Sequence, residues 1–122
     1  VYGGIPGVQH RVPFLLSLGF IDGNISLEKT IKLLNPYEYF IFENKGSISK
    51  DFDADFSIIN LWEKQKITYE SMFSKGKYTP FEGVELKVKV KQTFLRGELI
   101  FDSENKKNEN RDKLGKFLKV VA

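Results

Sequence analysis

The hydrophobic periodicity of this chain changes once, near Lys45, and this change constrains the fold more than any other feature. Before Lys45, apolar residues recur at intervals of three or four positions, which is the spacing of one face of an α-helix. After Lys45, apolar and polar residues alternate, and β-branched and aromatic residues become frequent, as in β-strands. We therefore expect an α+β chain with one boundary, between a helical region at residues 1–44 and a β region at residues 45–122.

Helices in the first region are delimited by turn and capping residues. The apolar spacing predicts a helix over residues 13–20, which Asp22-Gly23-Asn24 ends. Ser26 is expected to cap a second helix, because a serine side chain accepts a hydrogen bond from a free N–H group of the first turn. Asn35-Pro36 ends that helix and can start a third one that runs to Phe42. The apolar face of the second helix would consist of Leu27, Ile31 and Leu34.

Strands are expected at two places in the second region. Residues 56–61 are apolar on both faces, which predicts a strand at the centre of a sheet. Residues 84–94 alternate as in a half-exposed strand, and Arg96-Gly97 would turn the chain into a partner strand over residues 98–101. The polar stretch at residues 103–113 is expected to be a mobile excursion. The lysines of the alternating strand are expected on its solvated face, and they are Lys87, Lys89 and Lys91.

Composition excludes several classes of protein. The chain contains no cysteine, which removes disulfides and thiolate metal sites and fits the cytoplasm. No apolar run approaches the roughly 20 residues of a membrane-spanning helix, and the start lacks the layout of a signal peptide. Nineteen basic residues against sixteen acidic ones do not predict nucleic-acid binding. We expect a cytoplasmic protein with neither a nucleic-acid nor a membrane partner, whose sequence begins inside a longer polypeptide.

Candidate catalytic and metal-binding residues are few. The only histidine is His10, whereas hydrolytic zinc sites use several histidine or cysteine ligands; we expect it to be a surface or hydrogen-bonded polar residue. Asp51, Asp53 and Asp55 alternate like calcium ligands, but the glycine and glutamate that complete such a loop are missing, so we interpret them as turn residues. We expect the chain to contain no catalytic residue and no metal ligand of its own.

A glycine-rich stretch at residues 3–7 leaves two interpretations open. Glycines let backbone N–H and C=O groups approach a small planar ligand closely, which favours a binding loop. Clusters of glycine and proline mark ordinary turns more often than sites, so the motif alone favours a plain loop.

Several ordered blocks resemble the C-terminal part of the dihydroorotase, allantoinase and hydantoinase group of cyclic amidohydrolases. The resemblance runs from residue 3 to about residue 101, and its first block is GIPGVQHRVPFLL at residues 4–16. Gln9 stands where many relatives carry glutamate, and Tyr2 stands where some dihydroorotases carry proline. The further blocks are ISLE at 25–28, NP at 35–36, KGSI at 45–48, DADF at 53–56, SKGKYTPFEG at 74–83 and LRG at 95–97.

This resemblance implies a fold, a chemistry and a site. Residues 1–44 would be the last loop and helices of a metal-dependent (β/α)8 barrel, and residues 45–122 would be part of a β-sandwich with a polar tail. The complete enzyme would open or close a cyclic amide with water activated by two zinc ions. The family's metal ligands are a His-x-His pair, a carbamylated lysine, two histidines and an aspartate, which would all lie upstream. The resemblance places Gly3 and Gly4 against the ring of the substrate.

The resemblance leads to one main hypothesis and two alternatives. We expect a dihydroorotase of pyrimidine biosynthesis, which interconverts N-carbamoyl-L-aspartate and dihydroorotate. Allantoinase and hydantoinase or dihydropyrimidinase are the first alternative, and a non-catalytic homologue or interaction module is the second. The expected partners are a small cyclic amide, the N-terminal remainder of the enzyme and a further copy of it in a homo-oligomer. The 122-residue chain is expected to be inactive alone.

Overall fold

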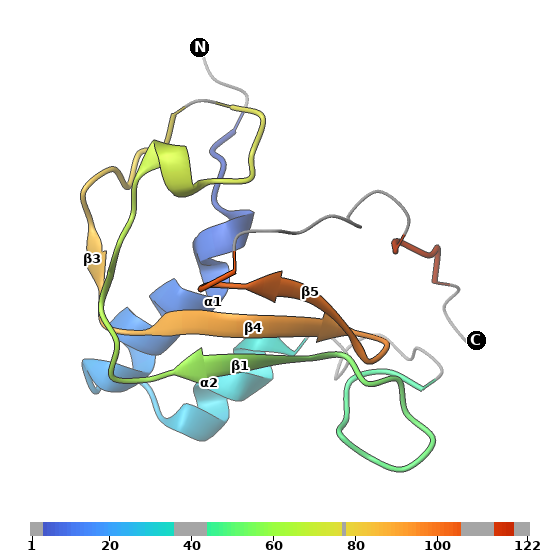
Figure 1. Ribbon diagram of the computed structural model, residues 1–122. Coiled ribbons are helices and arrows are strands. Elements are labelled where there is room, and N and C mark those ends of the chain that lie inside the picture. The colour runs from blue at the N-terminus through green and yellow to red at the C-terminus, as the bar shows by residue number, and fades with distance from the viewer. Residues whose placement is uncertain (1–3, 36–43, 77, 106–113, 119–122) are drawn as a thin grey trace. The chain divides into compact units, whose positions relative to one another are not determined.

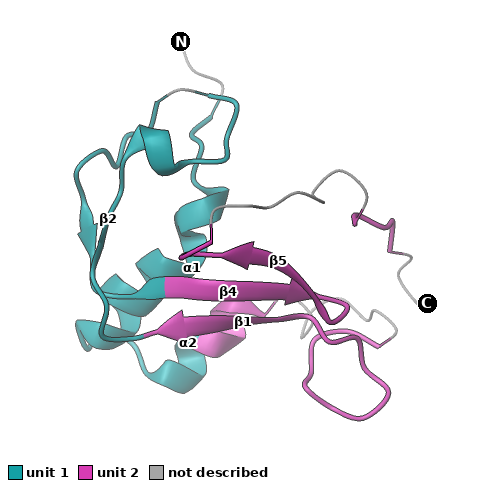
Figure 2. Ribbon diagram, viewed as in Figure 1, with its two compact units in different colours: residues 1–30, 61–89 teal, residues 31–60, 90–122 magenta. Residues whose placement is uncertain are grey.

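A computed structural model of the chain describes residues 4–35, 44–76, 78–105 and 114–118 (Figure 1). The chain divides into two compact units, each built from two separate stretches of sequence (Figure 2). Unit 1 consists of residues 1–30 and 61–89, and unit 2 consists of residues 31–60 and 90–122. The expected domain boundary between residues 44 and 45 stays a prediction. Within the described ranges, no helix has the length and apolar character needed to cross a bilayer.

Unit 1 begins with a continuous helical segment. The 3-10 helix η1 (Val8–His10) leads into α1 (Arg11–Phe14), which continues as the π-helix η2 (Leu15–Ile21). The predicted helix over residues 13–20 is therefore confirmed, although the helical segment starts earlier and widens towards its end. The side chain of Asn24 donates a hydrogen bond of 2.6 Å to the carbonyl of Leu18, so the predicted turn at residues 22–24 closes this end.

The second helix, α2 (Leu27–Leu34), begins where its capping residue predicted. The hydroxyl of Ser26 accepts a hydrogen bond of 3.2 Å from the N–H group of Lys29, which confirms Ser26 as the cap. On the predicted apolar face, Leu27 and Ile31 are exposed, so the described chain leaves part of that face uncovered. The predicted third helix falls largely on residues 36–43, which lie outside the described residues.

A short two-stranded ladder completes unit 1. β2 (Gln65–Lys66) pairs antiparallel with β3 (Glu85–Leu86), and the 3-10 helix η4 (Tyr69–Ser71) lies in the segment that joins them. The predicted strand over residues 84–94 is broken after Leu86, because the N–H group of Lys87 donates to the hydroxyl of Ser17 at 2.9 Å. Among the described residues, the buried aliphatic side chains that form the core are Leu16, Ile67, Leu86 and Val88.

Unit 2 contains a three-stranded sheet with the order β1-β4-β5 (Figure 1). Its strands are β1 (Phe56–Asn60), β4 (Lys89–Leu95) and β5 (Glu98–Asp102). β4 and β5 form the predicted antiparallel hairpin. Its turn has positive φ at Arg96 and Gly97, as tight hairpins require. The prediction that residues 56–61 form a central strand is wrong for the described sheet, because β1 lies at its edge and leaves Ile58 exposed.

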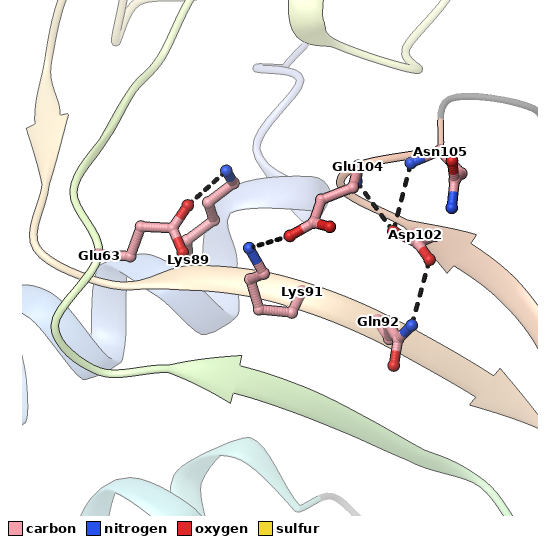
Figure 3. Close-up of polar contacts among 7 residues, drawn as sticks. All are labelled: Glu63, Lys89, Lys91, Gln92, Asp102, Glu104 and Asn105. Atoms are coloured by element: carbon pink, nitrogen blue, oxygen red, sulfur yellow. Dashed lines mark hydrogen bonds and ion pairs between the residues drawn. The ribbon is translucent and has the colours of Figure 1, made fainter.

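The lysines of the alternating strand are paired with acidic side chains. Lys89 binds Glu63 at 2.6 Å in unit 1, and Lys91 binds Glu104 at 2.9 Å in unit 2 (Figure 3). Lys87 forms an ion pair with Asp22. The expectation of a solvated lysine face is confirmed for Lys87, which is exposed, and is wrong in part for Lys89 and Lys91, whose side chains are half-buried.

A buried lysine holds the start of the β region together. Only 4% of the Lys45 side chain is exposed, and its ammonium group binds the carboxylates of Asp53 and Asp55. The second oxygen of Asp55 accepts the N–H group of Arg96 at 2.7 Å, so this carboxylate joins the segment at residues 44–55 to the hairpin turn. Burial disfavours the charge on Asp55, but hydrogen bonds from Lys45 and Arg96 outweigh burial and lower its pKa.

Removing the lysine of this cluster should destabilise the 122-residue chain. We expect Lys45→Ala to lower the free energy of unfolding by about 3 kcal/mol, because two carboxylates would be left together without a cation. Chemical denaturation measures this change. Lys64→Ala is the control, because it removes an ion pair with Glu85 in which both side chains are exposed, and it should leave stability nearly unchanged. Equal effects of the two substitutions would contradict the structural role of Lys45.

Candidate functional site

The glycine-rich loop has a defined backbone conformation from Gly4 onward. The N–H group of Gly7 donates to the carbonyl of Ile5 at 3.0 Å, which closes a three-residue turn around Pro6. Proline favours this turn because its ring fixes φ near the value that the turn needs. The N–H group of His10 then donates to the carbonyl of Gly7 at 3.1 Å and starts η1. Gly3, the first predicted site residue, lies outside the described residues.

Gly4, the second predicted site residue, is exposed and is not required by the local fold. A Cβ atom placed on Gly4 would have no neighbour within 4 Å among the described residues, and the φ angle of Gly4 lies outside the left-handed range that favours glycine. At Gly7 the nearest contacts of such an atom would be ordinary ones at 4.0 Å. Neither steric crowding nor backbone strain therefore explains these glycines. The absence of side chains leaves the backbone accessible, and the assignment of Gly3 and Gly4 to a substrate site stays a prediction.

A distant segment of unit 1 holds this loop at two points. The phenol of Tyr78 donates a hydrogen bond of 2.8 Å to the carbonyl of Gly4. The side chain of Gln9 donates to the carbonyl of Ser71 at 3.1 Å and accepts the N–H group of Phe73 at 2.9 Å. No local sequence pattern predicts these contacts, because the bonded residues are separated by 62 to 74 positions. The only indication was that Gln9 and Tyr78 both lie in blocks that resemble the amidohydrolases.

An aromatic contact accompanies these hydrogen bonds. The rings of Phe14 and Phe81 meet edge to face with their centroids 4.8 Å apart. Phe81 also lies next to Gly7. The helical segment that follows the loop and the segment that holds it therefore share an apolar contact as well as polar ones.

His10 is buried, so the expectation of a surface or hydrogen-bonded histidine is wrong. Its exposed fraction is 4%, its ring meets the edge of Phe14, and its Nδ1 atom has no hydrogen-bond partner among the described residues. The turn of η1 directs this side chain inward, which the position of His10 in the sequence did not indicate. Burial disfavours the imidazolium form and lowers the pKa of His10, so the ring is neutral at pH 7.

The described residues do not fit a zinc site. No group of three or more histidine, cysteine, aspartate or glutamate side chains in the described ranges could hold a metal ion. Asp53 and Asp55 instead neutralise Lys45. The two zinc ions implied by the resemblance would need ligands from elsewhere, and the expectation that this chain supplies none stays a prediction.

Comparison with known proteins identifies relatives among cyclic amidohydrolases. A dihydroorotase from Pyrococcus furiosus is 35% identical over 103 residues, which are 83% of this chain and 24% of that enzyme. An allantoinase from Solibacter usitatus is 31% identical over 106 residues, which are 85% of this chain and 23% of that enzyme. A solved structure of a D-hydantoinase has a TM-score of 0.76 at 30% identity, and the match covers 84% of this chain and 23% of that one. No protein-family model matches the chain.

These likenesses confirm the resemblance to the dihydroorotase, allantoinase and hydantoinase group. Both the sequence and the fold support it over about four fifths of the chain. The chain spans about a quarter of the length of the relatives that it matches. The relatives include a dihydroorotase, an allantoinase and a hydantoinase. The likeness therefore identifies the group of enzymes but does not select one substrate.

The burial of His10 should make stability depend on pH. The unfolded chain binds a proton on His10 near pH 6.5, whereas the folded chain binds it only at lower pH, so acidification favours unfolding. We expect the free energy of unfolding to fall between pH 7.5 and 5.5, by at most about 1.4 kcal/mol per pH unit from this group. His10→Phe keeps an aromatic ring and should flatten this dependence in denaturation measured across the range. If the free energy of unfolding depends on pH equally in the wild-type chain and in His10→Phe, the role of His10 is contradicted.

Proposed function

We propose that this chain is the C-terminal portion of a metal-dependent cyclic amide hydrolase, and that the enzyme is a dihydroorotase. The chain matches such enzymes over most of its own length but only about a quarter of theirs, which supports a larger parent polypeptide. The parent would be a cytoplasmic enzyme that forms a homo-oligomer. Its N-terminal remainder would supply the zinc ligands that the described residues lack.

In this proposal, residues 1–44 form the end of the catalytic barrel and residues 45–122 form part of a β-sandwich. Exposed apolar side chains on the helices and strands are consistent with surfaces that the rest of the enzyme covers. Leu27 and Ile31 on α2 would pack against the barrel, and Ile58 on the edge strand β1 would pack within the sandwich.

The role of the chain in the reaction is to bind and orient the substrate. The observation that carries this role is Gly4, an exposed glycine that the local fold does not require and that a distant tyrosine holds by its carbonyl. Dihydroorotate is a ring edged by amide N–H and C=O groups, which pair with peptide groups when no side chain intervenes. Gly3 and Gly4 would supply that backbone, so the chain would contribute binding energy and orientation to a reaction whose catalytic groups lie elsewhere.

Turnover by the complete enzyme distinguishes the proposed activity from its alternatives. We expect the zinc-loaded enzyme to interconvert N-carbamoyl-L-aspartate and dihydroorotate, and the 122-residue chain alone to be inactive. Hydrolysis of allantoin, or of hydantoin and dihydrouracil, without action on dihydroorotate would replace the dihydroorotase with the corresponding alternative. A metal-loaded protein that acts on none of them would support a non-catalytic homologue.

A methyl group on Gly4 should impair binding without harming the fold. In the complete enzyme, we expect Gly4→Ala to raise KM for dihydroorotate about tenfold, which corresponds to the loss of one good contact. Stability should be unchanged or up to about 1 kcal/mol higher, because alanine restricts the unfolded chain and meets no neighbour at this position. The measurements are steady-state kinetics and thermal unfolding.

Gly115→Ala is the matched control for this substitution. A Cβ atom on Gly115 also has no neighbour within 4 Å, and the residue lies outside the loop. It should leave KM unchanged. An unaltered KM in Gly4→Ala would remove Gly4 from the substrate site.

A further inference from the structure

We infer that Gln9 and Tyr78 are positioning residues, which fix the glycine-rich loop so that the Gly4–Ile5 peptide is presented to the substrate in one orientation. This inference rests on the proposed role of the loop. It adds a determinant of substrate binding from the β region, at residues 68–82, to a loop that the resemblance assigns to the barrel.

Tyr78 determines the direction of one peptide group. Its hydroxyl donates to the Gly4 carbonyl at 2.8 Å, and a peptide is planar, so holding the oxygen fixes the orientation of the Gly4–Ile5 unit. In a trans peptide the N–H group of Ile5 lies in that same plane and points opposite to the Gly4 carbonyl, and therefore away from Tyr78. Without this bond, exposed Gly4 would be free to rotate, because glycine is the residue with the widest choice of φ and ψ.

Gln9 holds η1, which directly follows the loop, and it uses both the nitrogen and the oxygen of its side-chain amide. The nitrogen donates to the Ser71 carbonyl, and the oxygen accepts the Phe73 N–H group. A glutamate here would keep the bond to Phe73, but its second oxygen would face the Ser71 carbonyl, and two acceptors repel each other. The amide is therefore the side chain that matches both backbone groups.

The segment that carries these contacts is itself anchored. The N–H group of Ser71 donates to the Thr68 carbonyl at 3.1 Å, and the N–H group of Tyr69 donates to the Glu82 carboxylate at 2.8 Å. Just before it, Ile67 is buried and exchanges hydrogen bonds of 2.9 Å with Gly83 and Val84. The loop is thus held by a segment that is tied to the core of unit 1.

Hydrogen exchange in the 122-residue chain tests the Gln9 contact without any assay of activity. We expect Gln9→Leu to accelerate exchange of the Phe73 amide, because that N–H group loses its acceptor. Gln9→Glu should keep the Phe73 amide protected. Unchanged exchange at Phe73 in Gln9→Leu would overturn the role of Gln9, whatever the enzyme does.

Kinetics of the complete enzyme test whether this positioning reaches the substrate. We expect Tyr78→Phe to raise KM for dihydroorotate about fivefold, as for the loss of one hydrogen bond, with kcat nearly unchanged. Tyr69→Phe is the matched control. It removes a hydroxyl from the same segment, but this hydroxyl bonds to Glu70 and not to the loop. It should leave both constants unchanged.

Comparing Gly4→Ala with Tyr78→Phe distinguishes a failure of the positioning role from a failure of the proposed substrate loop. If Gly4→Ala raises KM and Tyr78→Phe does not, the loop binds substrate and the positioning role of Tyr78 is wrong. If neither substitution changes KM while Gln9→Leu exposes the Phe73 amide, the contact exists but the loop does not meet the substrate, and the proposed role of Gly4 fails.

Discussion

Unit 1 depends on the meeting of Ser17 and Lys87, which are seventy positions apart in the chain. The Ser17 side chain is buried in the helical segment, and its hydroxyl accepts the N–H group of Lys87. A buried hydroxyl loses water on folding, so Ser17 needs a hydrogen-bond partner, and the N–H group of Lys87 supplies it. This bond takes Lys87 out of strand pairing, ends β3 at Leu86 and brings residues 65–87 back to the helical segment. The glycine-rich loop is held in place because its supporting segment belongs to that returning stretch.

The elements that the sequence predicted well are those whose determinants are local. Ser26 marks the start of α2 because a cap acts within one turn, and Arg96-Gly97 marks the hairpin because its φ angles depend on two adjacent residues. The wrong predictions concern residues whose conformation is determined by a contact with a distant part of the chain. Period-two alternation continued through Lys87, but the bond to Ser17 interrupts the strand. His10 looked like a surface residue because nothing in its neighbours shows which way η1 turns it.

In the candidate site, too, one residue was predicted from local sequence and the contacts with distant residues were not. Gly4 was predicted from a motif and a family resemblance, and the structure adds the physical observation that the local fold does not need a glycine there. Lys45, which neutralises Asp53 and Asp55, and the contacts of Gln9 and Tyr78 with distant backbone groups could not be predicted. Their partners have no characteristic sequence spacing. A sequence pattern therefore indicates which residues are available for binding, whereas the three-dimensional structure determines which of them are held in a defined position.

The most direct test of the account is a crystal structure of the complete enzyme with dihydroorotate bound. We predict that the ring lies against the backbone of Gly3 and Gly4, with the Gly4 carbonyl still bound by Tyr78 and the metal ions held by residues upstream of this chain. A ring bound away from Gly4, with the glycine-rich loop facing solvent, would contradict the central claim that this chain supplies the substrate loop.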